Sequence, residues 1–307
     1  MIKAFIVIIT LLVVSCTTIE TKVESPANIP IDENIKFINY LDNDWENNLI
    51  KNPLFASYVG DKRFNDKINS NSIDQFLNQK NSYKESLKIL QDIDISKLSD
   101  SNKLNYKLKE FGLMSSIGPD FPVYYLRLNQ RGGIQSFYET GNRLVYSSKK
   151  DYYDWYSRLK QFSSNIYSSL EINKAGLEKN ITQPKLVTKA VILQINSILN
   201  SSIEENPYLK VFKNADESFF LPDEKKLLIE NVKSLVENEI NPAYQKLNEF
   251  LQNEYLPKSR QTIGLEGVPG GKEYYEYLAR HFTTTDLTPN EIHEIGISEI
   301  KRIRSEM

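Results

Sequence analysis

The stretch "DYYDWYSRLKQFSSNIYSSL" (151–170) decides the fold, because its apolar residues recur every three or four positions. The members of this stripe are Tyr152, Trp155, Tyr156, Leu159, Phe162, Ile166 and Leu170. Such spacing puts the side chains on one face of an α-helix, whereas a strand would need alternation at every second position. The segment therefore predicts a long amphipathic helix whose aromatic face lies in a core.

Helical patterns extend to both sides of this stretch. Near the start, one helix face is formed by Phe37, Ile38, Leu41, Trp45 and Leu49. Asn52-Pro53 ends that run, and the segments 184–199 and 222–251 each open with proline, which the first helical turn tolerates. The best strand candidate, "FPVYYLRLN" (121–129), could equally be an extended connector. We therefore predict an all-α fold of about eight to ten helices with few or no strands.

The last segment, "TPNEIHEIGISEIKRIRSEM" (288–307), has a clear helix start. Thr288 suits the N-cap, Pro289 the first helical position, and Glu291 completes a capping box. Its apolar stripe consists of Ile292, Ile295, Gly296, Ile300, Ile303 and Met307. Because no helix-stop residue follows, we expect a domain over 31–307 that is incomplete at its C-terminus.

The N-terminus has the features of a lipoprotein signal. Lys3 precedes the 11 apolar residues "AFIVIITLLVV" (4–14), a run shorter than the roughly 20 residues needed to span a bilayer. Ser15-Cys16 follows, and residues 13–16 resemble a bacterial lipobox. We predict that residues 1–15 are a signal peptide and that acylated Cys16 anchors the protein in a lipid bilayer. The alternative is an ordinary secretory signal with an incidental cysteine.

A tether is predicted between this anchor and the helical domain. Residues 16–30 comprise the lipidated cysteine and "TTIETKVESPANIP", which is rich in Thr, Ser and Pro and has no periodicity. Thr17, rather than aspartate, follows the cysteine. In a cell with two membranes, that residue favours the outer membrane, and the domain would then face the periplasm.

Composition narrows the classes of partner and chemistry. Thirty-eight basic residues stand against 40 acidic ones, a net charge of −2, which becomes −3 when Lys3 is removed with the signal peptide. Without a basic field, nucleic acid is not an expected partner. Cys16 is the only cysteine, so after acylation no thiol remains for a disulfide, a nucleophile or a metal site.

The histidines do not form a zinc motif. His293-Glu294 could begin a His-Glu-x-x-His sequence, but Ile297 occupies the position of the second ligand. The other histidine, His281, lies beyond a helix break. A serine nucleophile would need one of these histidines as its base, and neither lies in a nucleophile-elbow context. We predict no catalytic and no metal-ligating residue in this chain.

Two glycine-containing segments are predicted to be turns. "GLEGVPGGKEYY" (264–275) fails as a phosphate-binding loop, because Glu266 replaces the first glycine and Glu273 follows the lysine. The "RGG" at 131–133 is likewise interpreted as a turn.

A polar cluster stands between the last two predicted helices. It consists of Arg280, His281, Thr283, Thr284 and Thr285. These side chains could line a cleft, since a polar cluster between two helices is unusual. Equally, they could only cap the helix ends.

Two blocks of the chain resemble the bacterial domain-of-unknown-function family 885. The first is "NPLFASYVGDKRFNDKI" (52–68), which looks like the family's opening motif. The second is residues 267–307, whose matching positions are Tyr274, Tyr275, Arg280, Thr283, Thr284, Thr285, Thr288, Pro289, Glu291, Ile292, His293 and Gly296. The resemblance is specific in these blocks, loose between them, and extends from about residue 35 to the end.

The resemblance implies a helical, secreted, often lipid-anchored, zinc-peptidase-like protein. The family pattern continues beyond this sequence to a His-Glu-x-x-Pro-Gly-His helix and a Glu-Gly-Trp segment, which would supply the zinc ligands and the general base. Zinc is thus implied for the full-length family and not for this chain. We expect an envelope lipoprotein that forms half of a larger helical metallopeptidase-like fold and is inactive alone, with a peptide substrate or a C-terminal half in trans as partner.

Two other functions stay open. The chain could be a stand-alone binding or interaction lipoprotein, or one subunit of a split peptidase. A downstream reading frame that carries the metal motif would favour a truncated or split peptidase over a stand-alone binding protein.

Overall fold

The computed structural model describes residues 32–307. The predicted signal peptide (1–15), Cys16 and the tether (16–30) lie outside the described residues. Contacts join Glu33–Met307 into one unit. All of its regular secondary structure is helical, and the only β-type pairing among the described residues is an isolated bridge between Pro184 and Arg260. The prediction of an all-α fold is confirmed.

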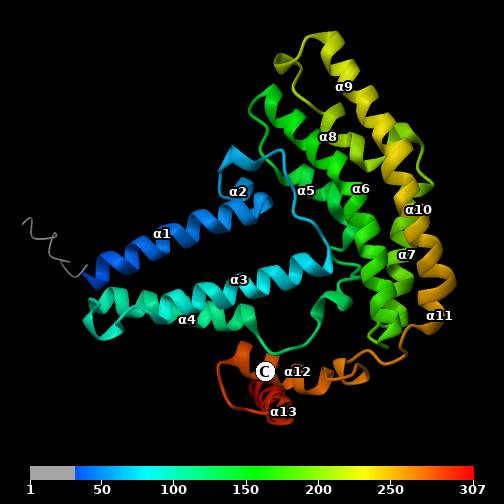
Figure 1. Cartoon of the computed structure of the whole chain (residues 1–307). Helices are drawn as coiled ribbons and strands as arrows, with labels where there is room; N and C mark the ends of the chain where they lie inside the picture. The colour runs from blue at the N-terminus through cyan, green and yellow to red at the C-terminus, as the bar shows by residue number, and fades with distance from the viewer. Residues whose placement is uncertain (1–31) are drawn as a thin grey trace, which may run out of the picture. The chain divides into compact units, whose positions relative to one another are not determined.

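The helices follow the chain in the order that Figure 1 labels. Their bounds are α1 Glu33–Lys51, α2 Pro53–Tyr58, α3 Ile73–Gln91, α4 Asp100–Ile117, α5 Phe137–Arg143, α6 Lys149–Glu178, α7 Lys185–Leu199, α8 Lys210–Lys213, α9 Pro222–Leu235, α10 Asn241–Phe250, α11 Leu256–Lys258, α12 Gly271–Thr283 and α13 Pro289–Glu306. Two π-helical segments, Val236–Ile240 and Leu251–Tyr255, join α9, α10 and α11 into one continuous helix. The strand candidate at 121–129 is instead a connector that contains a 3₁₀ turn, Val123–Leu126.

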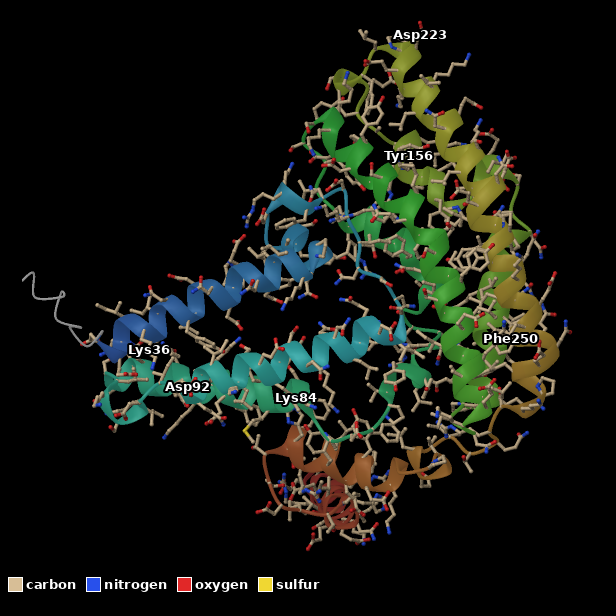
Figure 2. All side chains as sticks on the ribbon, in the orientation of Figure 1. Lys36, Lys84, Asp92, Tyr156, Asp223 and Phe250 are labelled. Carbon is tan, nitrogen blue, oxygen red and sulfur yellow. The ribbon has the colours of Figure 1, made fainter. Side chains whose placement is uncertain are left out.

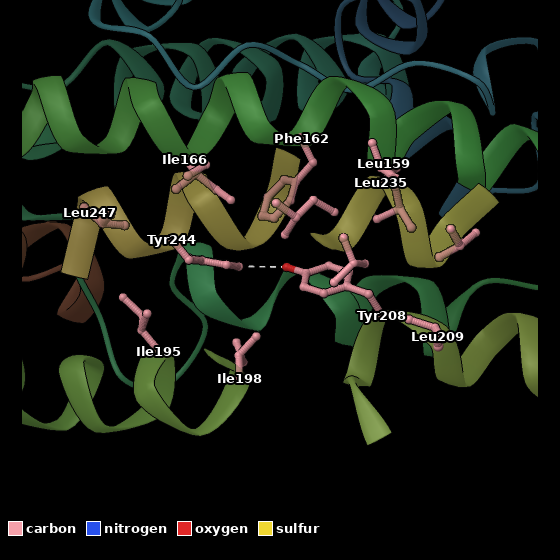
Figure 3. Close-up of a cluster of buried hydrophobic side chains, with 14 of the residues drawn as sticks. Leu159, Phe162, Ile166, Ile195, Ile198, Tyr208, Leu209, Leu235, Tyr244 and Leu247 are labelled. Carbon is pink, nitrogen blue, oxygen red and sulfur yellow. Dashed lines mark hydrogen bonds between the residues drawn. The ribbon is translucent and has the colours of Figure 1, made fainter. Parts of the chain in front are cut away.

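The 30-residue helix α6 provides the main core, as its apolar stripe predicts. Leu159, Phe162 and Ile166 are fully buried against α7, α9 and α10 (Figure 3). Tyr208 and Tyr244 share a hydrogen bond of 2.8 Å inside this cluster, and the Tyr244 hydroxyl also donates to the Ile134 carbonyl at 2.9 Å. Each buried side chain of this size contributes about 1.5–3 kcal/mol, so this cluster holds α6 in place.

A second, smaller core joins α1, α3 and α4. Figure 1 shows α3 and α4 side by side and running in opposite directions. The buried residues of this smaller core are Phe37, Tyr40, Leu90, Ile93, Leu98, Tyr106 and Leu113. At the end of α3, the Lys36 ammonium of α1 donates to the Asp92 carbonyl at 2.5 Å (Figure 2). That contact satisfies one of the carbonyls that a helix leaves free at its C-terminus.

A polar stripe lies beside the apolar one on α6, and it is buried as well. Its members are Asp151, Asp154, Arg158, Asn165, Ser169 and Asn173. The Arg158 guanidinium donates from Nε to the Lys67 carbonyl at 2.8 Å and from Nη2 to Ser57 Oγ at 2.6 Å. The Asn165 amide donates to the Asn69 carbonyl at 2.9 Å. The irregular segment 61–71 is therefore held along α6 by side-chain hydrogen bonds rather than by a backbone ladder.

Asp151 connects the first turn of α6 to this segment. Its carboxylate accepts bonds from Lys62 Nζ at 2.9 Å, from the Ser147 N–H at 2.9 Å and from Ser148 Oγ at 3.0 Å. Burial raises the pKa of Asp151, but these donors together outweigh burial and leave the pKa below its ordinary value. The ionised form is therefore favoured in the folded protein.

We expect Asp151→Asn to reduce stability in a pH-dependent way. Because the folded pKa is lowered, the carboxylate stabilises the protein above its ordinary pKa of about 4, and this contribution disappears as pH falls through the folded value. Urea unfolding should show a loss of about 1.5–3 kcal/mol at pH 7 that narrows below about pH 4. Asp120→Asn is the control, since that side chain is fully exposed. A deficit that stays constant with pH would contradict the assignment.

Candidate functional site

A cavity of about 700 Å³ lies where the start of α3, helix α5, the polar stripe of α6 and the loop 126–136 meet. Its size falls within the range of about 300–1,000 Å³ that is typical of small-molecule sites. The amide side chains that line it are Asn52, Asn69, Asn71, Gln75, Gln79, Asn129, Asn165 and Asn173. Three aromatic rings, those of Phe76, Phe137 and Phe162, complete the wall. A cavity with apolar rings and many polar groups can bind an organic ligand that carries polar functions.

The loop 126–136 is fixed by hydrogen bonds to its own chain and to α7. The Asn129 carbonyl accepts bonds from the Gly133 N–H at 3.0 Å and from Gln135 Nε2 at 2.8 Å. Gln194 of α7 donates to the Gln130 carbonyl at 3.0 Å and accepts from Gln135. A Cβ at Gly133 would lie 2.5 Å from the Asn129 carbonyl oxygen. The two backbone segments approach so closely that only glycine fits there. The "RGG" turn is thus a fixed part of the cavity wall.

Charge on the cavity wall is unequally distributed. Arg127, Arg131 and Arg143 line it, against one acid, Glu139. Arg143 and Glu139 form an ion pair at 2.9 Å, which neutralises both. Within residues 32–307, no carboxylate pairs with Arg127 or Arg131. The wall therefore carries two uncompensated positive charges in a chain whose net charge is −2.

Arg127 is held by an aromatic ring. Its guanidinium carbon lies 4.5 Å from the centroid of the Phe76 ring, and that ring stacks on Tyr124 with a centroid distance of 6.0 Å. The Arg127 side chain is exposed to solvent. The neighbouring protein atoms nevertheless displace part of the water around its guanidinium, and this desolvation lowers the pKa of Arg127. Stacking fixes the plane of the guanidinium and leaves the N–H groups at its edge able to donate.

Asn173 lies deep in the same wall. Its side chain is 4% exposed, and its Nδ2 donates to the Ser169 carbonyl at 2.7 Å. Among the described residues, no group donates to its Oδ1. A buried acceptor without a donor costs about 1–3 kcal/mol, so packing alone does not account for this group.

A second hollow, of about 690 Å³, lies between α1, α3 and α4, and four of its polar groups bind one another. Tyr40 and Ser86 share a hydrogen bond of 2.8 Å, Ser86 donates to Asp44 at 2.8 Å, and Lys109 pairs with the other Asp44 oxygen. Burial raises the pKa of Tyr40 to about 12, so its hydroxyl stays neutral. These hydrogen bonds and this ion pair connect α1, α3 and α4. The four side chains bond to one another and are therefore not free to bind a ligand. The cavity beside Arg127 is the better candidate site.

The predicted cleft residues at the end of α12 lie apart from that cavity. His281 lines a hollow of about 380 Å³, with its Nε2 3.0 Å from Ser115 Oγ and its ring stacked on Phe111 at 5.5 Å. These contacts pack α12 on α4. Arg280 is exposed and does not line the hollow.

The three threonines that follow are also exposed. The Thr283 hydroxyl donates to the Ala279 carbonyl at 2.8 Å and lies 2.9 Å from Thr285 Oγ1. Thr284 adopts a left-handed conformation, with φ of 54°, that ends α12. The structure therefore places Thr283, Thr284 and Thr285 in a helix-end turn and brings only His281 into a hollow.

The described residues do not fit the zinc ion that the family resemblance implies. Over residues 32–307, no group of three or more His, Cys, Asp or Glu side chains is arranged to hold a metal. His293 is exposed on α13, with Ile297 one turn later. In the same part of the chain, no helix is both long and apolar enough to cross a membrane.

Sequence reasoning missed the residues that make the cavity. In the sequence, Arg127 belongs to a segment that fits either a strand or a connector, and Arg131 and Gly133 have only the pattern of a turn. The polar stripe of α6 has a signal, since Asn165, Ser169 and Asn173 recur at intervals of four, but polar residues at helical spacing usually mark a solvated face. Nothing in the sequence marks these groups as neighbours.

Comparisons with known proteins cover most of the chain. A crystal structure described as "the putative lipoprotein from Colwellia psychrerythraea" has a similar fold, with a TM-score of 0.74 and 20% sequence identity. The match covers 89% of this chain and 49% of that one, so the chain spans about half the length of that protein. No curated protein matches the sequence. The family model described as "Bacterial protein of unknown function (DUF885)" matches residues 53–307.

Proposed function

Because the chain belongs to the bacterial protein family of unknown function DUF885, we propose that it is an envelope lipoprotein that forms the substrate-binding wall of a zinc-peptidase-like protein. In this proposal, the zinc ligands and the general base come from a C-terminal half outside this sequence. The 49% coverage of the similar crystal structure supports a larger fold of which this chain is one part.

The observation that carries the proposal is the cavity beside Arg127. Its rings, amides and guanidinium groups can bind and orient a peptide-sized ligand, because such ligands combine apolar side chains with amide and carboxylate groups. Peptide hydrolysis also needs an activated water and a base within hydrogen-bond reach. The lining contains no histidine, and its one carboxylate, that of Glu139, is paired with Arg143. The chain alone would therefore bind peptides without cleaving them.

This proposal predicts binding without metal or hydrolysis for the isolated domain. Purified residues 17–307, dialysed against zinc and then against buffer, should hold far less than one zinc per chain by elemental analysis. A fluorogenic peptide pool should be bound and left intact. As a control, His281→Ala and His293→Ala should leave the zinc content unchanged. One tightly bound zinc per chain, lost in either variant, would overturn the proposal.

A stand-alone binding lipoprotein is the second candidate. The exposed apolar residues of α13 provide the test that distinguishes it from a split peptidase. Ile295, Ile300 and Ile303 are each about half exposed, and Met307 is 99% exposed. A second polypeptide with the metal motif that binds this helix and restores cleavage would favour the split peptidase. Peptide binding with no such polypeptide encoded nearby would favour the binding protein.

The envelope location is part of the same proposal. It is supported by the lipobox-like residues 13–16, by Cys16 as the only cysteine, and by the similar fold of a protein that is itself described as a putative lipoprotein. We propose that the acylated Cys16 holds the helical domain on the periplasmic face of the outer membrane.

A further inference from the structure

We propose that the cavity binds the free C-terminal carboxylate of a short peptide through the guanidinium groups of Arg127 and Arg131. This inference rests on the proposed function in taking a peptide as the ligand, and it adds the group by which that peptide is recognised. It makes this chain a carboxyl-end recognition module.

Several amide groups of the wall are already engaged within the protein, whereas Asn173 Oδ1 has no donor among the described residues. Asn165 binds the main chain of Asn69 and Asn71, and Asn71 donates to Ser169 Oγ at 2.7 Å. Asn129 accepts from the Arg131 N–H at 2.8 Å. These amides hold the cavity open in one shape, so their capacity to select a ligand is reduced. An amide oxygen such as Asn173 Oδ1 only accepts hydrogen bonds and cannot bind a carboxylate, so the selection of an anion depends on cationic groups that make no such bonds.

The two arginines are such groups. The structure gives Arg127 one side-chain contact, the Phe76 ring at 4.5 Å, and gives the Arg131 side chain none. A planar guanidinium matches a carboxylate with two parallel N–H···O bonds, and a stacked guanidinium loses little freedom when it forms them. The Arg143–Glu139 pair adds no net charge, so the carboxylate would meet a wall of charge +2. A neutral or cationic chain end would not be held in this way.

The surroundings favour a peptide over a small inorganic anion. The arginines line a cavity of about 700 Å³, a space much larger than one anion fills, and the partly exposed ring of Phe137 also lines it. A peptide can place its carboxylate on the arginines and its apolar side chains against that ring.

The test compares two peptide pools that differ only at the C-terminus. Purified residues 17–307 are equilibrated by dialysis with N-acetylated tripeptides as free acids, and separately with the same tripeptides as C-terminal amides. Mass spectrometry then gives the retained fraction. Wild type should prefer the acids by about ten- to a hundred-fold, the range expected for hydrogen bonds to a charged group. In Arg127→Gln and Arg131→Gln this preference should fall at least five-fold. Arg304→Gln, on exposed α13, should behave as wild type.

Each outcome has a separate meaning. Equal retention of acids and amides by wild type would overturn the carboxylate inference and leave peptide binding intact. Retention of neither pool at millimolar concentration would overturn both the inference and the proposed function. Displacement of the acids by inorganic phosphate at equal concentration would show a general anion site and overturn the peptide assignment. Circular dichroism and thermal melting should show that both glutamine variants fold, because neither arginine makes an ion pair among the described residues.

Discussion

The Arg158→Met variant is expected to lose about 3 kcal/mol of its free energy of unfolding, a large share of the stability of an ordinary domain. The Arg158 side chain is 1% exposed, and no carboxylate pairs with it in the described part of the chain. Its guanidinium donates to four acceptors, which are Ser57 Oγ and the carbonyls of Pro53, Phe64 and Lys67.

Methionine would fill much of the space and donate to none of these acceptors. Each buried carbonyl left without a donor costs about 1–3 kcal/mol, while removal of a buried charge offsets part of the loss. Urea unfolding followed by circular dichroism measures the difference. Arg304→Met is the matched control, since Arg304 is exposed on α13 and its substitution should change stability by less than about 0.5 kcal/mol. A loss below about 1 kcal/mol for Arg158→Met would refute the role assigned to the guanidinium.

The variant should also impair the cavity. Segment 61–71, which Arg158 holds, includes Asn69 and Asn71 of the cavity wall. Arg158→Lys tests the geometry, because an ammonium keeps the charge but cannot reach acceptors on both its sides with a planar fork. Its stability should lie between that of wild type and that of Arg158→Met.

The Cys16→Ser variant is expected to move nearly all of the protein from the membrane to the soluble periplasmic fraction. Cys16 is the only thiol, and no other anchor is proposed for the chain. Several acyl chains on one residue give stable attachment, whereas a single chain holds only marginally. Cell fractionation and labelling with a palmitate analogue measure the change in a host with two membranes.

The residue after the cysteine provides the matched control. Thr17→Asp keeps the thiol, so this variant should stay acylated and membrane-bound, but should shift from the outer to the inner membrane. Cys16→Ser protein that still sediments with membranes after a high-salt wash would show that another contact, not the lipid, holds it there.

The sequence predicts those parts of the fold that depend on local periodicity. The apolar stripe of α6 recurs every three or four residues, and Trp155, Leu159 and Phe162 are buried as expected. The start of α13 is equally local, and both bonds of its Thr288–Glu291 capping box form. Such signals depend on residues close in sequence, so one sequence contains all the information they need.

The candidate site depends on contacts between distant residues and could not be predicted in this way. Asn165 binds Asn69, 96 positions earlier, and Gln194 fixes a loop 64 positions earlier. The stripe that includes Arg158 looks like a solvated helix face, and only the packed segment 61–71 makes it buried. Arg127 and Phe76 likewise meet because α3 and the loop after α4 converge, which no short motif encodes.

The attachment of segment 61–71 to α6 has a consequence for hydrogen exchange. The N–H of Asn71 donates to Asn165 and that of Ile68 to Gln161, while the carbonyls of Lys67 and Asn69 accept from Arg158 and Asn165. An irregular segment on a surface would ordinarily exchange its amides quickly and independently. Here the side chains that protect these amides come from the middle of a core helix. The segment and that helix should therefore open as one cooperative unit, with the slow exchange of the helix extended to a stretch whose own secondary structure is only the 3₁₀ turn Lys62–Phe64.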